Sequence, residues 1–353
     1  MTNEFEIISS RMVATEALSA FLQVEYPLGD VSSEDYLQWE YAKNPFGPAY
    51  VSLAMTTGNT IASQYALLPF TIIAGGKEMK ASLSLNTLTA ERYRGKGLFL
   101  KTAAASYHAC AEDGVTCTFG IPNANSYPGF TGRLGFRNCG NLVFSLKPLR
   151  PMKIVKSLVG GSKNKKGSDI PVDLRLSFGD ESIISRFDPV QDEKLFAEFF
   201  IRWKKDSTVL IHRSSSYLQW RYMMHPTRQY YLLKYVIRGK MLAWAALRML
   251  SVYGMKACVL MDFYCIETDA GKKLLNFISV SVKENGLDAI IAATASHAGI
   301  YPVLRASGFY NVPDFLLPQK LPFILKMHGR MDHTISLTEL NNWHFMFGDY
   351  DVF

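Results

Sequence analysis

Residues 89–98 read Thr89-Ala90-Glu91-Arg92-Tyr93-Arg94-Gly95-Lys96-Gly97-Leu98, and they carry the clearest indication of the fold class. It follows an alternating segment, residues 79–89, that predicts a strand, and it precedes an Ala- and Leu-rich segment, residues 98–113, that predicts a helix. Two glycines separated by one residue allow a tight turn whose main-chain N–H groups can approach a ligand closely. The start of the helix and the basic side chains of the stretch place positive charge at the same point. The stretch therefore predicts a loop that binds a pyrophosphate group.

The segments around this loop predict a mixed α/β domain. A solvated basic turn would have a similar composition, and it is the position between a strand and a helix that favours a binding loop. Hairpin signals at Gly58-Asn59 and Gly75-Gly76-Lys77 predict an antiparallel meander before it. The predicted helices are 15–24, 34–41, 98–113 and 125–134, and the predicted strands are 50–55, 61–70, 71–74, 79–89, 115–121 and 141–146.

The chain contains an internal repeat. Tyr36-Leu37-Gln38-Trp39 recurs as Tyr217-Leu218-Gln219-Trp220, and collinear matches follow, such as Tyr127-Pro128 with Tyr301-Pro302. The second copy has the same predicted order, with strands at 230–236, 242–250, 256–266 and 289–294 and helices at 271–284 and 299–306. We therefore predict two tandem copies of one domain, residues 1–150 and residues 171–353. The Gly-, Ser- and Lys-rich residues between them, 151–170, are predicted to form a linker.

Composition limits the classes of protein that the chain can belong to. The formal net charge is +7, which suits a polyanionic ligand and does not require nucleic acid. The five cysteines form no Cys-x-x-Cys pair, so we expect a reducing compartment and neither a disulfide framework nor a metal site. The first residues do not resemble a signal peptide, and no apolar stretch has the length of a membrane span. These features predict a cytoplasmic protein.

Two motifs resemble a known superfamily. Arg92-Tyr93-Arg94-Gly95-Lys96-Gly97 resembles the Arg/Gln-x-x-Gly-x-Gly/Ala signature of the GNAT superfamily of N-acetyltransferases, and Leu134-Gly135-Phe136 resembles the end of its later helix. The resemblance covers about residues 81–144, and Ser307-Gly308-Phe309 is similar in the second copy. It implies tandem GNAT-like domains, each with a mixed, mainly antiparallel sheet flanked by helices. It also implies an enzyme, an acyl-CoA-dependent N-acyltransferase.

The whole chain resembles the two-domain members of this superfamily, and nucleotide-sugar N-acyltransferases in particular. That resemblance implies an acceptor of the dTDP-linked 3-amino-3,6-dideoxyhexose type, used for cell-surface polysaccharide such as the O-antigen of lipopolysaccharide. An amine of a peptide or amino acid is an alternative acceptor. A non-catalytic acyl-CoA-binding module is a third possibility, and the oligomeric state stays open.

The resemblance also implies which residues hold the coenzyme. The pantetheine arm would follow the strand, the pyrophosphate would sit on the loop, and an Asn from the later helix would meet the pantetheine arm or the adenosine. The implied residues are Asn86, Thr87, Leu88, Thr89, Arg92, Arg94, Gly95, Lys96, Gly97, Leu98, Phe99, Asn123 and Asn125.

The second copy departs from this pattern. At the position of the loop it has residues 266–273, in which Glu267 and Asp269 replace the arginines and only Gly271 remains of the glycines. Carboxylates close to a pyrophosphate would repel it more than Lys272 and Lys273 could attract it. We therefore predict that acyl-CoA binds the first copy only and that the second copy shapes the acceptor pocket.

Amide formation from a thioester needs an uncharged amine, a donor to the oxyanion and a proton for the leaving thiolate. The resemblance implies a carboxylate base on the strand and a Tyr acid, but residues 82–89 contain no carboxylate and the usual Tyr position falls on Thr131. Tyr127 is the candidate acid, and Asp262 or His297 is the candidate base; ordered water could also relay the proton. Each of the three also has a structural interpretation, as a packed turn residue, a paired carboxylate or a capping histidine. The Tyr-Leu-Gln-Trp motif, present in both copies, is predicted to be structural, and no metal site is predicted.

Overall fold

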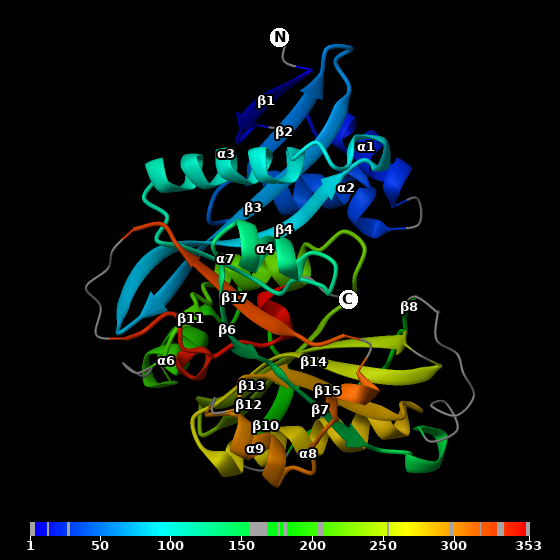
Figure 1. Ribbon diagram of the computed structural model, residues 1–353. Coiled ribbons are helices and arrows are strands. Elements are labelled where there is room, and N and C mark those ends of the chain that lie inside the picture. The colour runs from blue at the N-terminus through cyan, green and yellow to red at the C-terminus, as the bar shows by residue number, and fades with distance from the viewer. Residues whose placement is uncertain are drawn as a thin grey trace.

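The computed structural model describes residues 4–12, 14–26, 29–154, 168–174, 177–178, 182–203, 208–252, 254–296, 299–317, 319–329 and 335–350. These residues form two sheets, and Figure 1 shows the first in the upper half of the molecule and the second in the lower half. The predicted linker, residues 151–170, falls largely on residues 155–167, which lie outside the described residues.

The first sheet has the strand order β1-β2-β3-β4-β5-β17-β6, with β11 added beside β3. Its neighbours are antiparallel except for the parallel pair β4 and β5. The strands are β1 (Phe5–Ser10), β2 (Tyr50–Thr56), β3 (Ile61–Ala74), β4 (Lys77–Thr89), β5 (Cys117–Gly120), β6 (Arg137–Asn141), β11 (Leu210–Ile211) and β17 (Pro322–Met327).

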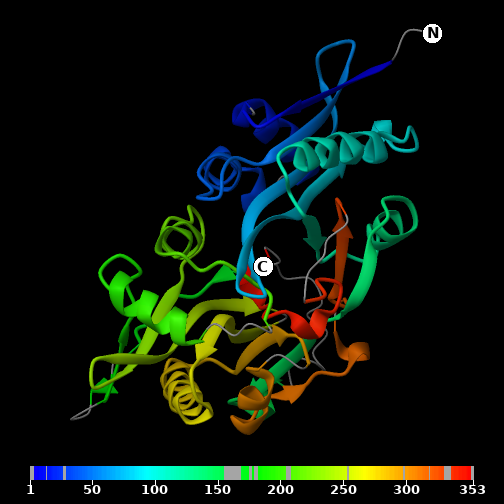
Figure 2. The ribbon, with the colours of Figure 1, turned by 90° about the vertical axis from the view of Figure 1, so that its left-hand side faces the viewer.

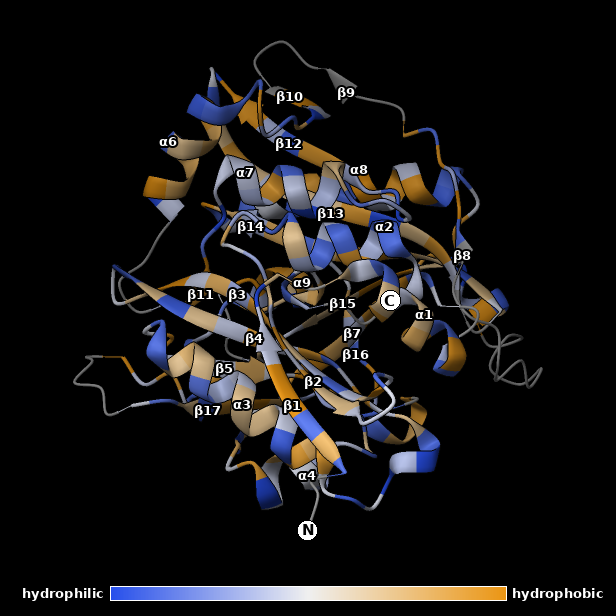
Figure 3. Ribbon diagram, turned by 90° about the horizontal axis from the view of Figure 1, so that it is seen from above, coloured by the Kyte–Doolittle hydropathy of each residue, from blue (hydrophilic) through white to orange (hydrophobic). Residues whose placement is uncertain are grey.

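The second sheet repeats this plan with the order β16-β7-β15-β14-β13-β12-β10-β9, and β8 pairs with β13. Its parallel pair is β14 with β15. The strands are β7 (Val143–Pro148), β8 (Ser168–Asp169), β9 (Ser177–Phe178), β10 (Ser182–Arg186), β12 (Tyr231–Ile237), β13 (Lys240–Val252), β14 (Met255–Cys265), β15 (Ala289–Thr294) and β16 (Tyr310–Asn311). Apolar residues dominate β12 and β13, as the orange colouring in Figure 3 shows, and residues 243–250 of β13 are all buried.

Helices cover both sheets. They are α1 (Thr15–Glu25), α2 (Glu34–Leu37), α3 (Leu98–Glu112), α4 (Tyr127–Arg133), α6 (Glu193–Trp203), α7 (Ser215–Leu218), α8 (Thr268–Glu284) and α9 (Tyr301–Ala306). Two five-residue π-helical segments, η2 (Gln38–Ala42) and η4 (Gln219–Met223), continue α2 and α7. The short 3-10 turns are η1 (Asp30–Ser32), η3 (Glu91–Tyr93), η5 (Asp314–Leu316), η6 (Leu340–Asn342) and η7 (Phe347–Asp349). Both α2 and α7 are preceded by a serine, Ser33 or Ser214, whose side chain accepts a hydrogen bond from the main-chain N–H three residues later, which stabilises each helix start.

The two halves exchange a strand. In the first sheet β17, from near the C-terminus, lies between β5 and β6; in the second sheet β7, from the first half of the chain, lies in the matching place between β15 and β16. Figure 1 shows β17 beside β6 near the middle of the molecule and β7 in the lower half. Sheet membership therefore crosses the predicted boundary at residue 150, and the division into residues 1–150 and 171–353 stays a prediction.

The tertiary structure changes three element predictions. The segments 61–70 and 71–74 form one strand, β3, because residues 66–74 continue the pairing with β4 without a turn. The single predicted strand 141–146 falls on the end of β6 and most of β7, which belong to different sheets. The first strand, β1, was not predicted.

The repeated motif holds the halves together. The indole rings of Trp39 and Trp220 stack with centroids 4.7 Å apart and planes at 12°. Trp39 Nε1 donates to the carbonyl oxygen of Trp220 at 2.8 Å, and Trp220 Nε1 donates to the carbonyl oxygen of Trp39 at 2.8 Å. Both residues are buried. The two copies thus meet through a reciprocal contact, which confirms that the motif has a structural role.

His225 packs on this contact from the second half. Its ring lies 4.2 Å from that of Trp39 and 5.5 Å from that of Tyr36, and its Nδ1 accepts bonds from the amides of Thr227 and Arg228. Burial, with smaller contributions from nearby arginines, lowers the pKa of His225 to about 2. The ring is therefore neutral in the folded protein.

Replacing Trp39 with Phe tests the reciprocal contact. The substitution removes the indole N–H and leaves the buried carbonyl of Trp220 without that donor, so we expect the free energy of unfolding to fall by about 1–3 kcal/mol in urea titration. Trp220→Phe should cost a similar amount, because the two bonds are equivalent. A loss below about 0.5 kcal/mol for both variants would contradict the role given to the contact.

His225 also predicts a pH dependence of stability. The unfolded chain binds a proton at a histidine near pH 6.5, whereas folded His225 binds one only near pH 2. Its stabilising contribution is therefore complete above pH 6.5 and is lost as pH falls below that value. His225→Asn keeps an acceptor for the two amides and removes the titration. In the unsubstituted protein the free energy of unfolding should fall between pH 6.5 and 4.5. In His225→Asn we expect this fall to be smaller by about 1 kcal/mol per pH unit.

The exposed His108 of α3 provides the control for this measurement. His108→Asn should leave the pH dependence as it is in the unsubstituted protein. An unchanged slope in His225→Asn would show that His225 already carries a proton in the folded protein.

Candidate active site

The first sheet opens between its two parallel strands. Residues Ala81–Leu83 of β4 pair with Cys117–Phe119 of β5, and beyond this point the strands separate. From Ser84 to Thr89, the edge of β4 that faces β5 has no partner among the described strands. Main-chain N–H and C=O groups along that edge are therefore available to a ligand.

A β-bulge in β4 lies next to this opening. The register of β3 and β4 shifts between Gln64 and Ala66, where Asn86 and Thr87 of β4 lie opposite the single residue Tyr65 of β3. Asn86 has a φ of 48°, in the left-handed region that Asn tolerates better than most residues. Gln64 Nε2 donates to the carbonyl oxygen of Asn86 at 2.8 Å and fixes the distorted backbone. The bulge bends β4 away from regular pairing next to the cleft.

The opening is a cleft of about 260 Å³. One wall is β4 at the bulge, and the opposite wall is the segment that follows β5. The region between α1 and α2 covers one side, and Tyr350 reaches it from near the C-terminus. Its lining residues are Leu22, Tyr26, Val31, Glu40, Leu83, Ser84, Leu85, Asn86, Thr87, Gly120, Ile121, Pro122, Asn123, Ser126, Phe130, Ile324 and Tyr350.

Glu40 places a carboxylate in the lining of this cleft, and it was not among the site residues predicted from the sequence. The residue lies on η2 and is 2% exposed. Its Oε2 accepts a bond from Asn86 Nδ2 at 2.7 Å, and its Oε1 accepts one from the Tyr36 hydroxyl at 3.3 Å. Asn86 Nδ2 also donates to the hydroxyl of Tyr41 at 3.1 Å. The acid is thus fixed against the bulge of β4.

The predicted pyrophosphate loop is open to solvent. Gly95 and Gly97 have φ values of 80° and 71°, and a Cβ added at either would meet nothing within 4 Å. Gly97 caps the start of α3, whose first turn contains no acidic residue. The first N–H groups of a helix have no partner within the helix, so the amides around Leu98 point their positive ends at this space.

The cations of the loop are exposed. The guanidinium of Arg92 lies over the ring of Tyr93, 4.7 Å from its centroid, and Arg94 Nε lies 3.5 Å from the carbonyl oxygen of Thr89. Lys96 forms an ion pair with Glu4 in the segment before β1. A bound anion would compete with Glu4 for Lys96.

Leu98 and Phe99 anchor the start of α3 through their side chains. Leu98 is buried beside Ala54 and Ala62. The ring of Phe99 lies against α4, where a Cβ added at Gly129 would stand 3.0 Å from it. Any contact of Leu98 and Phe99 with a coenzyme would therefore come from their amides.

The two predicted asparagines differ in their surroundings. Asn123 lines the cleft, and its Oδ1 accepts bonds from the amides of Asn125 at 3.1 Å and Ser126 at 3.0 Å, which turns the chain into α4. Asn125 is exposed and is not among the residues that line the cleft.

The three predicted catalytic residues do not meet at this cleft. The hydroxyl of Tyr127 accepts a bond from Asn138 Nδ2 at 2.9 Å, outside the cleft lining. Asp262 is fully buried on β14, where Arg213 binds its two oxygens at 2.8 and 3.1 Å and the Tyr222 hydroxyl donates to it. These are the contacts of a structural carboxylate. His297 lies outside the described residues.

The matching opening in the second sheet is filled by the chain itself. β14 and β15 pair over Ala257–Val259 and Ala289–Ile291, and η7 packs against both strands. Gly348 in η7 fits closely: a Cβ added there would stand 3.0 Å from Asp262 Cγ. Arg213 Nη2 also donates to Asp349 Oδ1 at 2.6 Å. Figure 2 shows this last segment, in red, between the two halves of the molecule.

The residues at the equivalent position of the two repeats carry opposite charges. Glu40 follows the first Tyr-Leu-Gln-Trp motif, and Arg221 follows the second. Arg221 Nε donates to the carbonyl oxygen of Gly348 at 3.1 Å, and its Nη2 donates to that of Tyr350 at 3.5 Å. This difference between the copies is the sequence signal that would have identified Glu40.

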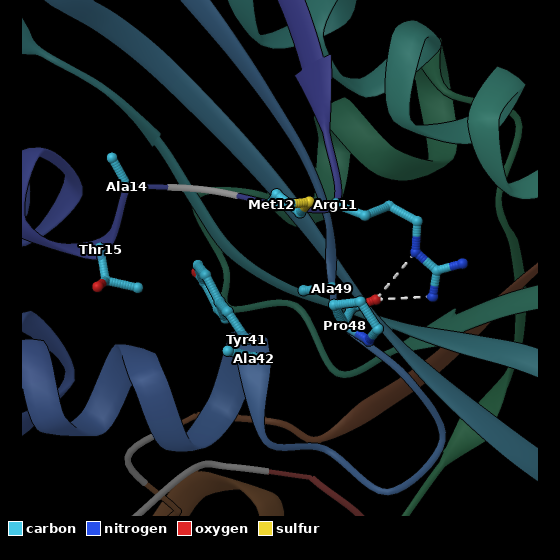
Figure 4. A pocket seen from close by; sticks show the side chains of 8 residues that line it. All are labelled: Arg11, Met12, Ala14, Thr15, Tyr41, Ala42, Pro48 and Ala49. Atoms are coloured by element: carbon cyan, nitrogen blue, oxygen red, sulfur yellow. Dashed lines mark hydrogen bonds between the residues drawn. The ribbon is translucent and has the colours of Figure 1, made fainter.

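A separate depression of about 470 Å³ lies where β1 leads into α1. Figure 4 shows it between Thr15 and Tyr41 on one side and Arg11 on the other, with Arg11 bound to the carbonyl oxygen of Pro48. It has no lining residue from β4 or β5, and none of the predicted site residues within the described chain lines it. The cleft beside the bulge, by contrast, is lined by Asn86, Thr87 and Asn123, three of the residues predicted to hold the coenzyme.

Two further features bear on the class of protein. Within the described residues, no helix combines the length and the apolar character that a membrane crossing requires. The same part of the chain holds no group of three or more His, Cys, Asp or Glu side chains placed to bind a metal ion.

Comparison with known proteins identifies a domain in the first part of the chain. Residues 13–139 match the family model described as "Acetyltransferase (GNAT) domain". This match contains the bulged strand, the glycine loop and Glu40. Residues 13–139 therefore form a GNAT acetyltransferase domain, which supports an acyl-CoA-dependent N-acyltransferase. The predicted superfamily, fold class and type of enzyme are confirmed.

Solved structures share the fold across nearly the whole chain. A probable N-acyltransferase from Enterococcus faecalis V583 matches with a TM-score of 0.65 and 11% identity, over 92% of this chain and 73% of that one. A GCN5-related N-acetyltransferase from Anabaena variabilis matches with a TM-score of 0.62 and 10% identity, over 92% and 73%. Saccharomyces cerevisiae N-myristoyltransferase with bound myristoyl-CoA matches with a TM-score of 0.60 and 11% identity, over 94% and 80%. A search of curated protein sequences finds no match.

Gly95→Asp tests the loop. The substitution adds a side chain where φ is 80° and a negative charge where the phosphates would bind, so we expect the affinity for CoA to fall by at least about 100-fold in calorimetry, or roughly 3 kcal/mol. Gly132→Asp is a matched control on α4, where an added Cβ also meets nothing within 4 Å, and it should bind CoA normally. Unchanged affinity in Gly95→Asp would show that the coenzyme does not use the loop.

Proposed function

We propose that the protein binds acyl-CoA between β4 and β5 of the first sheet and transfers the acyl group to an amine that enters from the side of α1 and α2. The observation that carries this proposal is the free edge of β4 from Ser84 to Thr89, which leads directly to the glycine loop at the start of α3. The pantetheine arm contains two amide groups, and they can pair with this edge as a further strand would. The pyrophosphate would then reach the amides around Gly97.

The same edge of β4 would provide main-chain amides that bind the oxyanion of the reaction. A thioester carbonyl placed at the bulge would find amide N–H groups of β4 without strand partners in the described sheet. Such amides can bind the oxygen on which negative charge develops. The amine would attack from the face of the cleft that Leu22, Tyr26 and Val31 cover.

We propose one coenzyme per chain. In the second sheet the corresponding space is occupied by η7, and α8 begins beside Glu267 with Asp269 in its first turn. Steric exclusion and charge both oppose a second coenzyme there. Calorimetry with CoA should therefore give a stoichiometry of one, and Asp269→Arg alone should not raise it. A stoichiometry of two in the unsubstituted protein would contradict the proposal.

The acceptor that the sequence predicts is a dTDP-linked 3-amino-3,6-dideoxyhexose, which would place the protein in the cytoplasm and in the synthesis of cell-surface polysaccharide. Its amino sugar ring suits a cleft whose charged lining residue is Glu40. No Lys or Arg is among the described lining residues, so the diphosphate would have to lie outside the cleft. Because of that observation, the amine of a peptide or amino acid, which has no phosphate, is a second candidate.

Release of free thiol from acyl-CoA, measured with a panel of amines, separates these acceptors. The panel contains a dTDP-linked amino sugar, the same sugar without its nucleotide, free amino acids and a short peptide with a free N-terminus. We expect turnover with the nucleotide sugar and little with the free sugar. Turnover with the amino acids or the peptide alone would support the second candidate, and no thiol release with any amine, despite CoA binding, would contradict acyl transfer to this range of amines.

A further inference from the structure

We propose that Glu40 is the catalytic base that takes the proton from the acceptor amine. The inference rests on the proposed function and assigns the group that the predicted strand lacks. Three observations on the described residues carry it: the position of the carboxylate in the cleft, the bonds that orient it, and the residue at the same position of the second repeat.

Glu40 lies where the two substrates would meet. Its side chain lines the cleft together with Ser84, Leu85 and Thr87 of β4, which the thioester end of the coenzyme would follow. Tyr26, on the side from which the amine would enter, lines the same cleft as Glu40. The carboxylate is buried, so bulk water does not screen its attraction for an ammonium group.

Two hydrogen bonds from neutral donors orient the carboxylate of Glu40. Asn86 Nδ2 holds Oε2 at 2.7 Å, and the Tyr36 hydroxyl holds Oε1 at 3.3 Å. Both donors are neutral, and each carboxylate oxygen can accept two hydrogen bonds. The carboxylate can therefore keep these bonds and accept a further N–H from a substrate. Because Asn86 is the bulge residue, its amide ties the carboxylate to the strand that would carry the thioester.

The second repeat shows where a side chain at this position points. Arg221 occupies the position of Glu40, and it donates to the main-chain carbonyls of Gly348 and Tyr350, the segment that fills the second opening. The side chain at this position thus contacts whatever occupies the opening. In the first half the opening is a cleft, and the corresponding side chain is an acid that would contact the ligand.

The proposed step balances as follows. The acceptor enters as an ammonium ion, and the carboxylate of Glu40 takes one proton, which leaves a neutral amine. The amine nitrogen attacks the thioester carbon and forms the C–N bond; the C–S bond then breaks, and CoA leaves as a thiolate. The thiolate takes the second proton that the nitrogen loses, so the products are an amide and the free thiol. Glu40 returns its proton to solvent when the products leave.

The titratable groups near Glu40 do not share this role. Tyr36 and Tyr41 lie on its own helical segment, Tyr26 and Tyr350 line the same cleft, and the ion pair of Arg228 with Asp30 packs at Tyr36. Burial raises the pKa of Tyr41 and that of Tyr350 well above their ordinary range. These two phenols therefore stay neutral between pH 6 and 9.

Glu40→Gln tests the proposal because it keeps the size and the acceptor atom for Asn86. With acyl-CoA and the best amine of the panel, we expect kcat at pH 7 to fall by about 10²–10⁴-fold. The affinity for CoA should stay within about twofold. The rate of the variant should rise about tenfold per pH unit toward pH 9, because solution then supplies the neutral amine. Glu34→Gln, an exposed acid on α2, is the matched control and should behave as the unsubstituted enzyme.

The outcomes distinguish the failure of this inference from the failure of the proposed function. An active Glu40→Gln with an unchanged pH profile would overturn the role of Glu40 and leave acyl transfer standing. A variant that loses CoA binding together with activity, and that Glu40→Asp does not restore, would show a structural role and would also overturn it. Absence of turnover in the unsubstituted protein would instead contradict the proposed function.

Discussion

The separation of two parallel strands is the constraint on which the rest of this structure depends. β4 and β5 pair over Ala81–Leu83 and then part, which leaves a strand edge inside the protein whose main-chain groups need partners. The second sheet has the same geometry, and there residues of the chain itself, around Gly348, fill the opening. In the first sheet the bulge at Asn86 and the glycine loop continue the open edge toward the start of α3. One architectural feature thus produces a filled, structural copy and an open copy suited to a coenzyme.

The two copies are joined so that neither completes its sheet alone. Each sheet contains strands from the other half: β17 and the short β11 in the first, and β7 in the second. The reciprocal bonds between Trp39 and Trp220 lie where the halves meet, one residue before Glu40 and Arg221. The segment around Gly348 fills the opening of the second sheet, and Tyr350 at its end lines the cleft of the first sheet. The geometry of the candidate site therefore depends on both halves.

Local patterns in the sequence predicted the glycine loop, the repeat and most strands and helices, because turn residues and apolar periodicity are local signals. They did not predict the strand exchange or the separation of β6 from β7, which depend on pairing with residues more than a hundred positions away. Local patterns also did not indicate Glu40 as a candidate base, because the candidates were Asp262, on a strand, and His297, whereas Glu40 lies on the helical segment η2. Only the tertiary structure shows that Asn86 joins Glu40 to β4.

A crystal structure with a non-hydrolysable acyl-CoA analogue tests the central claim most directly. The account predicts the pyrophosphate on the amides from Gly95 to Phe99, the pantetheine arm along residues 84–89, and the acyl carbonyl within reach of the cleft that Glu40 lines. A coenzyme bound between β14 and β15, or a complex in which the glycine loop holds nothing, would contradict it.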